Sequence, residues 1–327
     1  MMIYVFSSVF ASEIEQYLIL LSESERYICK IQSSLRSLDR YMVNNNLTTK
    51  VLEARTITEW TKTRNVSLRT KAQDISNISG FVKFLVSLGI EASCPESPKI
   101  KSNYVPYVFS DVELEGIFLT ADNYGFENAL TQSTLSFPIL LRVLYSCGLR
   151  LGEGCSLRWK DVDLENGILT IKESKNLKQR FVPMEDSVTE LLRSYRELTR
   201  INSICDNYLF ESTHTSGKPC NNKMFYDWFV KILAAANINY SRRRKNERGP
   251  CPHSLRHCFT LKSFLKSETE GRRFEDTAPV LASYLGHDSP KELETYLRSS
   301  YTVYKQSHHR VNAAIGHLFP EVSFDED

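Results

Sequence analysis

Two arginines in this sequence lie in short motifs that suit the binding of an anion. Arg150 follows Gly148 in a Gly-Leu-Arg-x-x-Glu run. A glycine at a helix end lets the backbone turn, so the guanidinium points outward and Glu153 is placed to orient it. Arg256 lies three residues after His253, and on a helix both side chains project to one face and can meet the same anion. Taken alone, the first motif is better explained as a capped helix with a surface ion pair.

Lysines are concentrated between two β-prone segments, 168–171 and 180–183, which we interpret as a hairpin. A lysine at a hairpin tip can reach a phosphate or donate a proton to a leaving oxygen. A solvent-exposed turn is the simpler explanation, and the residues alone do not choose between the lysines. The candidates are Lys172, Lys175 and Lys178.

A zinc site is the alternative use of the segment around Arg256. The potential ligands there are Cys251, His253, His257 and Cys258. Their spacing matches none of the common paired-ligand patterns, and two of the four would face away from the others on a helix. We therefore expect no metal.

A further segment runs from Tyr284 through Leu and Gly to His287, and Tyr296 follows nine residues after that histidine. Tyrosine is usually a packing residue, and the chain has 16 of them, so a single tyrosine carries no weight. The segments become informative only when they are read together.

In order, these segments resemble the tyrosine recombinase (phage integrase) family. The shared order is Gly-Leu-Arg-x-x-Glu, a hairpin lysine before Arg-x-Val-Pro, His-x-x-Arg-His, Leu-Gly-His, and a tyrosine nine residues later. The resemblance covers nearly the whole chain. It implies an active-site set of Arg150, Lys175, His253, Arg256, His287 and Tyr296, supported by Glu153.

Two assignments in that set have competitors. Lys175 is preferred because it lies five residues before Arg180, as in the family's hairpin, but Lys172 and Lys178 stay open. Tyr301 and Tyr304 compete with Tyr296 only if the nine-residue spacing fails.

The resemblance implies cutting and rejoining of DNA through a covalent 3′-phosphotyrosine, without metal, ATP or another cofactor. The arginines and His287 would stabilise the charge of the transition state. Tyr296 would attack, His253 would accept its proton, and Lys175 would protonate the departing 5′ oxygen. Two other functions stay open: a DNA-binding regulator that no longer cuts, and a type IB-like topoisomerase that uses the same intermediate.

The family also suggests partners and a branch. The interval from Arg256 to His287 is longer than in compact members, and the Leu-Gly-His and Thr-Tyr-Leu phrases look more like the transposon-borne branch. The expected partners are double-stranded DNA with specific recombination sites and three further copies of the chain, in a homotetramer on two duplexes. An accessory DNA-bending or directionality factor and a C-terminal helix near 311–319 that docks on a neighbour are further expectations.

The elements that must position these residues are mainly helical. Apolar residues recur at three- and four-residue steps from 11 to about 89, which predicts four short helices, and Thr56 with Glu59 forms a capping-box pattern. Prolines mark a linker at about 92–106. We expect a SAM-like, core-binding helical bundle at 1–103 and a catalytic domain at 104–327.

The catalytic domain is expected to be mostly helical with one small antiparallel sheet. Ser110 and Glu113 form another capping-box pattern at its start. Helices are expected at 111–120 and 134–146, and again from 186 onward, around the hairpin that carries the lysines.

Composition agrees with a soluble protein of about two domains. The chain has 327 residues, of which 42% are hydrophobic and 24% charged, and no apolar run is long enough for a membrane helix. The apolar stretch at 1–10 lacks the leading positive charges of a signal peptide. Eight cysteines without C-x-x-C pairs favour a reducing cytoplasm.

Charge is nearly balanced overall, at +2, but it is unevenly distributed. Basic residues are concentrated in a run at 242–248. Such a run attracts phosphates because binding releases counterions, although a solvated loop explains this run equally well. The expected DNA-binding residues in the run are Arg242, Arg243, Arg244, Lys245 and Arg248.

Overall fold

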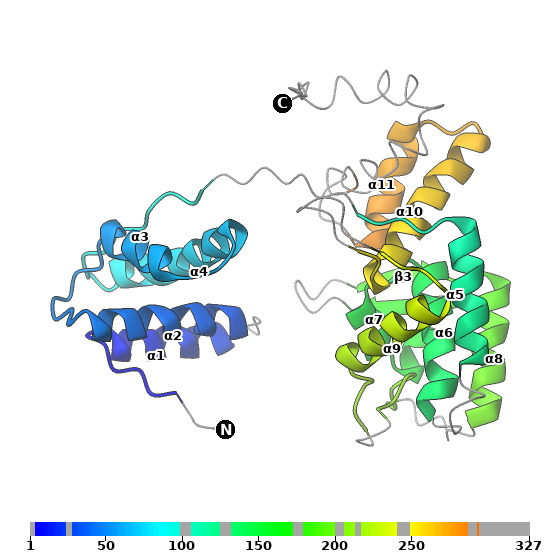
Figure 1. The fold of residues 1–327 in the computed structure, drawn as a ribbon, viewed down its shortest axis with the longest axis horizontal. Helices are drawn as coiled ribbons and strands as arrows, with labels where there is room; N and C mark the ends of the chain where they lie inside the picture. Colours follow the sequence, from blue (N-terminus) through cyan, green and yellow to red (C-terminus); the bar gives the residue numbers. More distant parts are fainter. Residues whose placement is uncertain are drawn as a thin grey trace. The chain divides into compact units, whose positions relative to one another are not determined.

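The computed structural model divides into two compact units, Met1–Ser102 and Asn103–Asp327 (Figure 1). The residues that it describes are 4–23, 28–98, 106–124, 132–172, 179–199, 206–212, 217–240, 249–286 and 293. Each unit has its own hydrophobic core, and each is described by itself.

The first unit is a bundle of short helices. They are α1 (Ala11–Glu23), α2 (Cys29–Asn44), α3 (Ala54–Thr63) and α4 (Leu68–Ser87). Leu35 and Leu38 of α2 pack with Ile78 and Phe81 of α4 and with Trp60 of α3, and all five are almost completely buried. The prediction of four amphipathic helices is confirmed, because the apolar residues at three- and four-residue steps form this core.

The predicted capping box at Thr56 and Glu59 is wrong. Helix α3 begins two residues before Thr56, and its first N–H group, on Ala54, donates to Ser93 Oγ at 2.9 Å. Ser93 is brought there by backbone bonds that join Leu52 to the segment after α4. The cap comes from a residue 39 positions away, so no local pattern could reveal it. The predicted linker also begins too early, because Ala92 packs against the core of the bundle.

The second unit is mostly helical and contains a small sheet. Its helices are α5 (Asp111–Asn123), α6 (Gln132–Ser146), α7 (Leu151–Ser156), the 3-10 turn η1 (Trp159–Asp161), α8 (Asp186–Thr199), α9 (Asn222–Ala235), α10 (Pro252–Thr269) and α11 (Phe274–Leu285). The strands are β1 (Val162–Asp163), β2 (Ile168–Lys172) and β3 (Gln179–Pro183), antiparallel in that order. The predicted fold class is confirmed. Within the described ranges, no helix is long and apolar enough to cross a membrane.

The local signal at the start of α5 behaves as predicted, and a proline marks the start of α10. Ser110 and Glu113 form a complete capping box at α5, in which Ser110 Oγ accepts from the Glu113 backbone and the Glu113 side chain accepts from the Ser110 backbone. Helix α10 begins at Pro252, where a missing N–H group costs nothing because the first turn leaves it unbonded anyway.

The sheet turns one charged side chain inward. Strand side chains alternate between the two faces, and the register pairs Leu169 with Val182 and Ile171 with Arg180. Leu169, Ile171 and Val182 are buried, whereas the intervening Phe181 is 68% exposed. Arg180 therefore lies on the buried face of β3, where its charge needs a partner.

Candidate active site

Three of the six expected active-site residues lie in the described part of the chain: Arg150, His253 and Arg256. Three lie outside the described residues: Lys175, His287 and Tyr296. The expected basic run also lies outside them, namely Arg242, Arg243, Arg244, Lys245 and Arg248. The site is therefore built from the arginines and the elements that hold them.

Arg150 precedes α7 and is held by Glu153 in the first turn of that helix. The Arg150 backbone N–H donates to Glu153 Oε2 at 2.9 Å, and its Nη1 donates to Glu153 Oε1 at 2.8 Å. The carboxylate therefore fixes both the backbone and the guanidinium. The Arg150 side chain is 39% exposed, so it remains accessible from solvent.

Arg256 is completely buried in the first turns of α10. Its Nη1 donates to the Gly148 carbonyl at 2.9 Å, and its Nη2 donates to the Leu285 carbonyl at 2.6 Å. Nη1 also lies 3.9 Å from Glu153 Oε2. Arg150 and Arg256, which are 106 positions apart in the sequence, thus meet at the same carboxylate.

Arg180 is a member of this cluster that sequence reasoning missed. Its Nη2 donates to Glu153 Oε2 at 2.8 Å and its Nη1 to Glu153 Oε1 at 3.2 Å. This is the two-pronged geometry in which guanidinium and carboxylate bind most strongly. The signal that could have found Arg180 was the strand alternation, since it places Arg180 on the same face as the apolar Val182.

The three arginines also bind three consecutive carbonyls at the end of α11. Arg180 Nε donates to the Tyr284 carbonyl at 2.9 Å, Arg256 Nη2 to the Leu285 carbonyl, and Arg150 Nη2 to the Gly286 carbonyl at 3.2 Å. The last carbonyls of a helix lack partners within it, and positive charge is favourable there. The end of α11 is fixed by groups from three other elements.

Glu153 is the negative centre of the cluster, and its side chain is 10% exposed. Burial by itself raises the pKa of the Glu153 carboxyl, but the hydrogen bonds and charge of Arg180, together with the hydrogen bonds from Arg150, outweigh it. The pKa is held below its ordinary value, so the group is an anion at neutral pH. One carboxylate faces three guanidiniums, which leaves the cluster positively charged.

His253 lies on the first turn of α10 and is exposed, in contrast to Arg256 three residues later. Its ring meets that of the buried His257 edge to face, with centroids 4.7 Å apart. The two residues expected to share a face thus differ in depth: His253 lies at the surface, and Arg256 reaches inward to the end of α11.

Of the three hairpin lysines, the described one is Lys172. Its Nζ lies 2.6 Å from Asp161 Oδ1, and the Asp161 side chain is 9% exposed. Lys172 is thereby held at the end of β2 by an ion pair. Lys175 and Lys178 lie outside the described residues.

The cysteines near His253 do not point to a common centre. Cys258 is buried, and its Sγ accepts a hydrogen bond from the Phe109 backbone N–H at 3.1 Å. Across the described ranges, no three His, Cys, Asp or Glu side chains are arranged to hold a metal ion.

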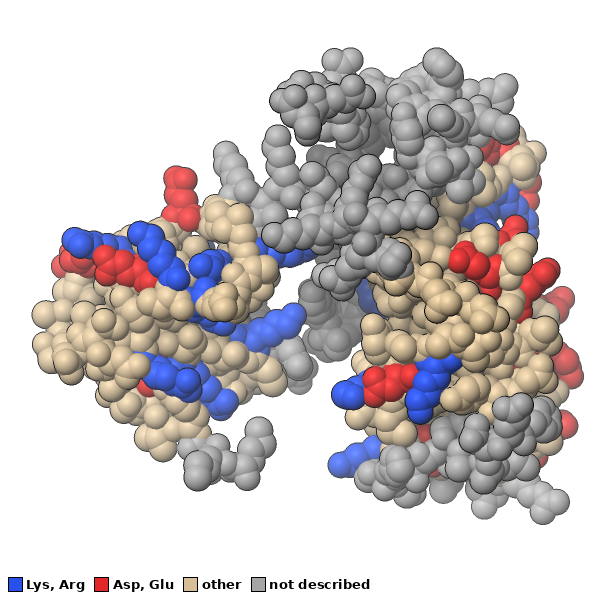
Figure 2. All heavy atoms as spheres, viewed as in Figure 1, with Lys and Arg blue, Asp and Glu red and all other residues tan. Residues whose placement is uncertain are grey.

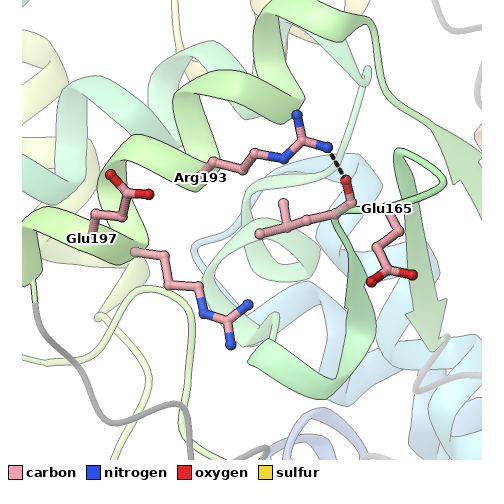
Figure 3. A pocket seen from close by; sticks show the side chains of 5 residues that line it. Glu165, Arg193 and Glu197 are labelled. Atoms are coloured by element: carbon pink, nitrogen blue, oxygen red, sulfur yellow. Dashed lines mark hydrogen bonds between the residues drawn. The ribbon is translucent and has the colours of Figure 1, made fainter.

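A hollow on another part of the second unit is lined by Leu164, Glu165, Arg193, Arg196 and Glu197 (Figure 3). Arg193 Nη2 donates there to the Leu164 carbonyl at 2.5 Å, and Nη1 to Glu190 Oε2 at 3.1 Å. Its charges are balanced, and none of the clustered arginines lines it.

The phage integrase family matches residues 113–302, which is more than half of the chain. A similar protein is the putative integrase/recombinase y4rB of Sinorhizobium fredii, with 29% identity over 179 residues that cover 54% of this chain and 55% of the relative. The chain therefore spans just over half the length of that relative.

Two further comparisons extend over more of the chain. The tyrosine recombinase XerC of Chlorobaculum parvum is 26% identical over 266 residues, which cover 74% of this chain and 73% of the relative. The Tn1549 transposon integrase, solved in complex with transposon right-end DNA, has a TM-score of 0.60 at 14% identity and covers 90% of this chain and 99% of that one. At this identity, the structural match shows a shared fold.

Proposed function

The chain belongs to the phage integrase family, and from this premise we propose that it is a site-specific DNA recombinase. The observation that carries the proposal is the meeting of Arg150 and Arg256 at Glu153 and at the end of α11. It supports a preorganised centre of positive charge, which is what a reaction at a DNA phosphate requires.

The proposed reaction is an attack on phosphorus by a phenol. The Tyr296 oxygen forms a bond to the phosphorus as the bond to the 5′ oxygen breaks, which leaves a 3′-phosphotyrosine. His253 takes the phenol proton, and Lys175 protonates the 5′ oxygen. A 5′-hydroxyl of another strand then attacks the phosphotyrosine and releases Tyr296, so the number of phosphodiester bonds is unchanged and no ATP is needed.

The arginines have a separate role in this reaction. Charge builds on the non-bridging oxygens of the phosphate as the nucleophile approaches, and guanidiniums are permanently charged donors in a fixed plane. Arg150 is accessible to a phosphate from solvent. Arg256 is buried beneath it and fixes the Gly148 turn and the end of α11 through their carbonyls. His287, directly after the clamped end of α11, is proposed as a third donor.

The first unit is proposed to bind DNA through α2 and α4. The only acidic residues of these two fully described helices, Asp39 and Asp74, are buried. Asp39 accepts from Tyr4 Oη at 2.8 Å, and Asp74 pairs with Arg64 at 2.8 Å. The surface that the helices expose therefore carries basic groups without acidic ones, namely Lys30, Arg36, Arg40, Arg69, Lys71 and Lys83. Figure 2 shows Lys and Arg side chains, in blue, on the visible face of this unit, beside acidic side chains in red. Such a surface suits phosphate contacts.

The branch and the assembly are finer proposals. The long interval before His287 and the likeness of fold to a transposon integrase support a recombinase of a mobile element, which acts in the cytoplasm. We assign it a homotetramer on two duplexes with specific sites, assisted by an accessory DNA-bending or directionality factor. The basic run at 241–248 and the helix near 311–319 would contact DNA and a neighbouring copy, respectively.

The function is tested with a nicked suicide substrate that traps covalent adducts. The wild-type protein is expected to form a protein–DNA adduct, and Tyr296→Phe is expected to bind the same DNA but form none. Adducts that persist in Tyr296→Phe would refute the nucleophile. Binding without any wild-type adduct would support a regulator, and relaxation of plasmids regardless of sequence would support a topoisomerase.

A further inference from the structure

Arg180 stands out because its position is costly and the proposed chemistry does not use it. A buried charge is tolerated only when it is paired and hydrogen-bonded. The Arg180 side chain is 10% exposed, and Nε, Nη1 and Nη2 all donate to protein oxygens. Those oxygens belong to Glu153, which also binds Arg150, and to the Tyr284 carbonyl at the end of α11, where Arg256 and Arg150 bind the next two carbonyls.

We propose that Arg180 is a positioning residue for strand cleavage, which occupies Glu153 and clamps the end of α11 so that Arg150 stays available to the DNA phosphate and Arg256 stays in place beneath it. This inference rests on the proposed recombinase function and deepens it.

Arg180 first changes the charge that acts on the other two arginines. Glu153 holds Arg150 through Oε1 and lies 3.9 Å from Arg256 through Oε2. Arg180 donates to both of these oxygens. Without Arg180, the whole negative charge of Glu153 would act on Arg150 and Arg256, and it would compete with the phosphate for the accessible Arg150. Arg180 offsets that charge from the side of the sheet, where no phosphate is needed.

Arg180 also fixes the geometry of the end of α11. Helix α11 ends at Leu285 and is capped by Gly286, which has left-handed backbone angles, with φ 68° and ψ 47°. Each of the last three carbonyls accepts from a different arginine, and Arg180 supplies the first of these bonds, at Tyr284. Loss of this bond loosens the end of α11, to which Arg256 and Arg150 also bind. A misplacement of about 1 Å is enough to slow a positioned reaction about 10²-fold.

The experiment measures the single-turnover rate of adduct formation and, separately, the Kd for the same DNA. Arg180→Met is expected to lower the rate about 10²-fold and to leave the Kd within about threefold, because Arg180 does not face the DNA in this proposal. Arg180→Lys keeps the charge but not the fork, so it is expected to recover part of the rate. Arg193→Met is the matched control, since Arg193 also binds one carboxylate and one carbonyl, on α8.

A double-mutant cycle with Glu153→Gln separates positioning from simple support of the fold. In the Glu153→Gln background there is no carboxylate for Arg180 to occupy. Arg180→Met is therefore expected to slow adduct formation there by less than about a tenth of the factor by which it slows the otherwise wild-type protein. The double variant also removes the unpaired buried charge, so it is available if Arg180→Met folds poorly.

The outcomes are distinct. Three results would overturn the inference while wild-type cleavage stands. Arg180→Met could slow adduct formation by the same factor with and without Glu153→Gln, it could lose DNA affinity in proportion to rate, or it could cleave at the wild-type rate. A wild-type protein that forms no Tyr296-dependent adduct overturns the proposed function and this inference together. A slowed Arg193→Met would show that loss of an arginine paired with a carboxylate and a carbonyl elsewhere in this unit has the same effect, and would also overturn it.

Discussion

The guanidinium of Arg256 donates to the carbonyl of Gly148 at 2.9 Å, and so links the start of α10 to the turn before Arg150. Gly148 has a φ of 58°, in the left-handed region. A Cβ atom there would lie 2.5 Å from the ring of Phe259, which is also on α10. The turn that presents Arg150 and accepts from Arg256 is therefore open only to glycine.

Gly148→Ala is expected to destabilise the second unit by more than about 2 kcal/mol, because it adds the clash with Phe259 to a left-handed penalty of about 1–2 kcal/mol. Urea unfolding measures the effect. Gly271→Ala is the control, since Gly271 has a φ of 77° and no atom within 4 Å of the added Cβ. If both variants lose the same stability, the contact with Phe259 is not tight.

The low pKa of Glu153 predicts a specific pH dependence of stability. Because the pKa of this carboxyl is lower in the folded than in the unfolded protein, its ionisation stabilises the fold above the unfolded value and this contribution is lost as pH falls through the folded value. The stability of Glu153→Gln should therefore fall less steeply than that of wild type below about pH 4.3. Urea midpoints from pH 7 to 3 check this, and parallel curves would contradict it.

Ser93→Ala is expected to cost the first unit about 1 kcal/mol, the usual loss for a helix cap. It removes the hydroxyl that accepts from the first N–H group of α3. Thr56→Ala is the matched control, because Thr56 lies within α3 and alanine is the better helix former. Thermal unfolding of the two variants decides whether the distant or the local residue caps this helix, and a larger loss in Thr56→Ala would reverse the assignment.

Lys30→Ala with Arg40→Ala is expected to weaken DNA binding evenly across sequences. Each lost phosphate contact should reduce the slope of log K against log salt by about 0.9. Arg55→Ala is the control, since Arg55 is exposed on α3 of the same unit but pairs with Glu59 at 3.0 Å. Fluorescence anisotropy at several salt concentrations gives the slopes. An unchanged slope in the double variant would exclude α2 from the DNA interface.

The sequence predicted what depends on local pattern. The amphipathic helices of the first unit, the hairpin strands and the capping box at Ser110 follow from residue spacing, and the structure confirms them. The arginines at 150 and 256 could be singled out because they lie in short motifs. Their roles in catalysis stay predictions, as do those of Lys175, His287 and Tyr296.

What could not be predicted depends on contacts between distant segments. The cap of α3 comes from Ser93, and Arg180 gains its meaning only when β3 brings it to Glu153 and to the end of α11. Alternation along β3 places Arg180 on the same face as Val182, but only the fold shows that Glu153 and the end of α11 lie against that face.

The three hydrogen bonds that hold the end of α11 depend on side chains at the donors but only on the main chain at the acceptors. The acceptors are main-chain carbonyls of residues 284 to 286, and every amino acid has one. Substitutions at Tyr284 or Leu285 that preserve the helix keep all three acceptors, whereas a single codon change at any of the arginines deletes a donor outright. The clamp therefore constrains the side chains of the three arginines but only the backbone of the helix end, where Leu285 is constrained separately by its burial.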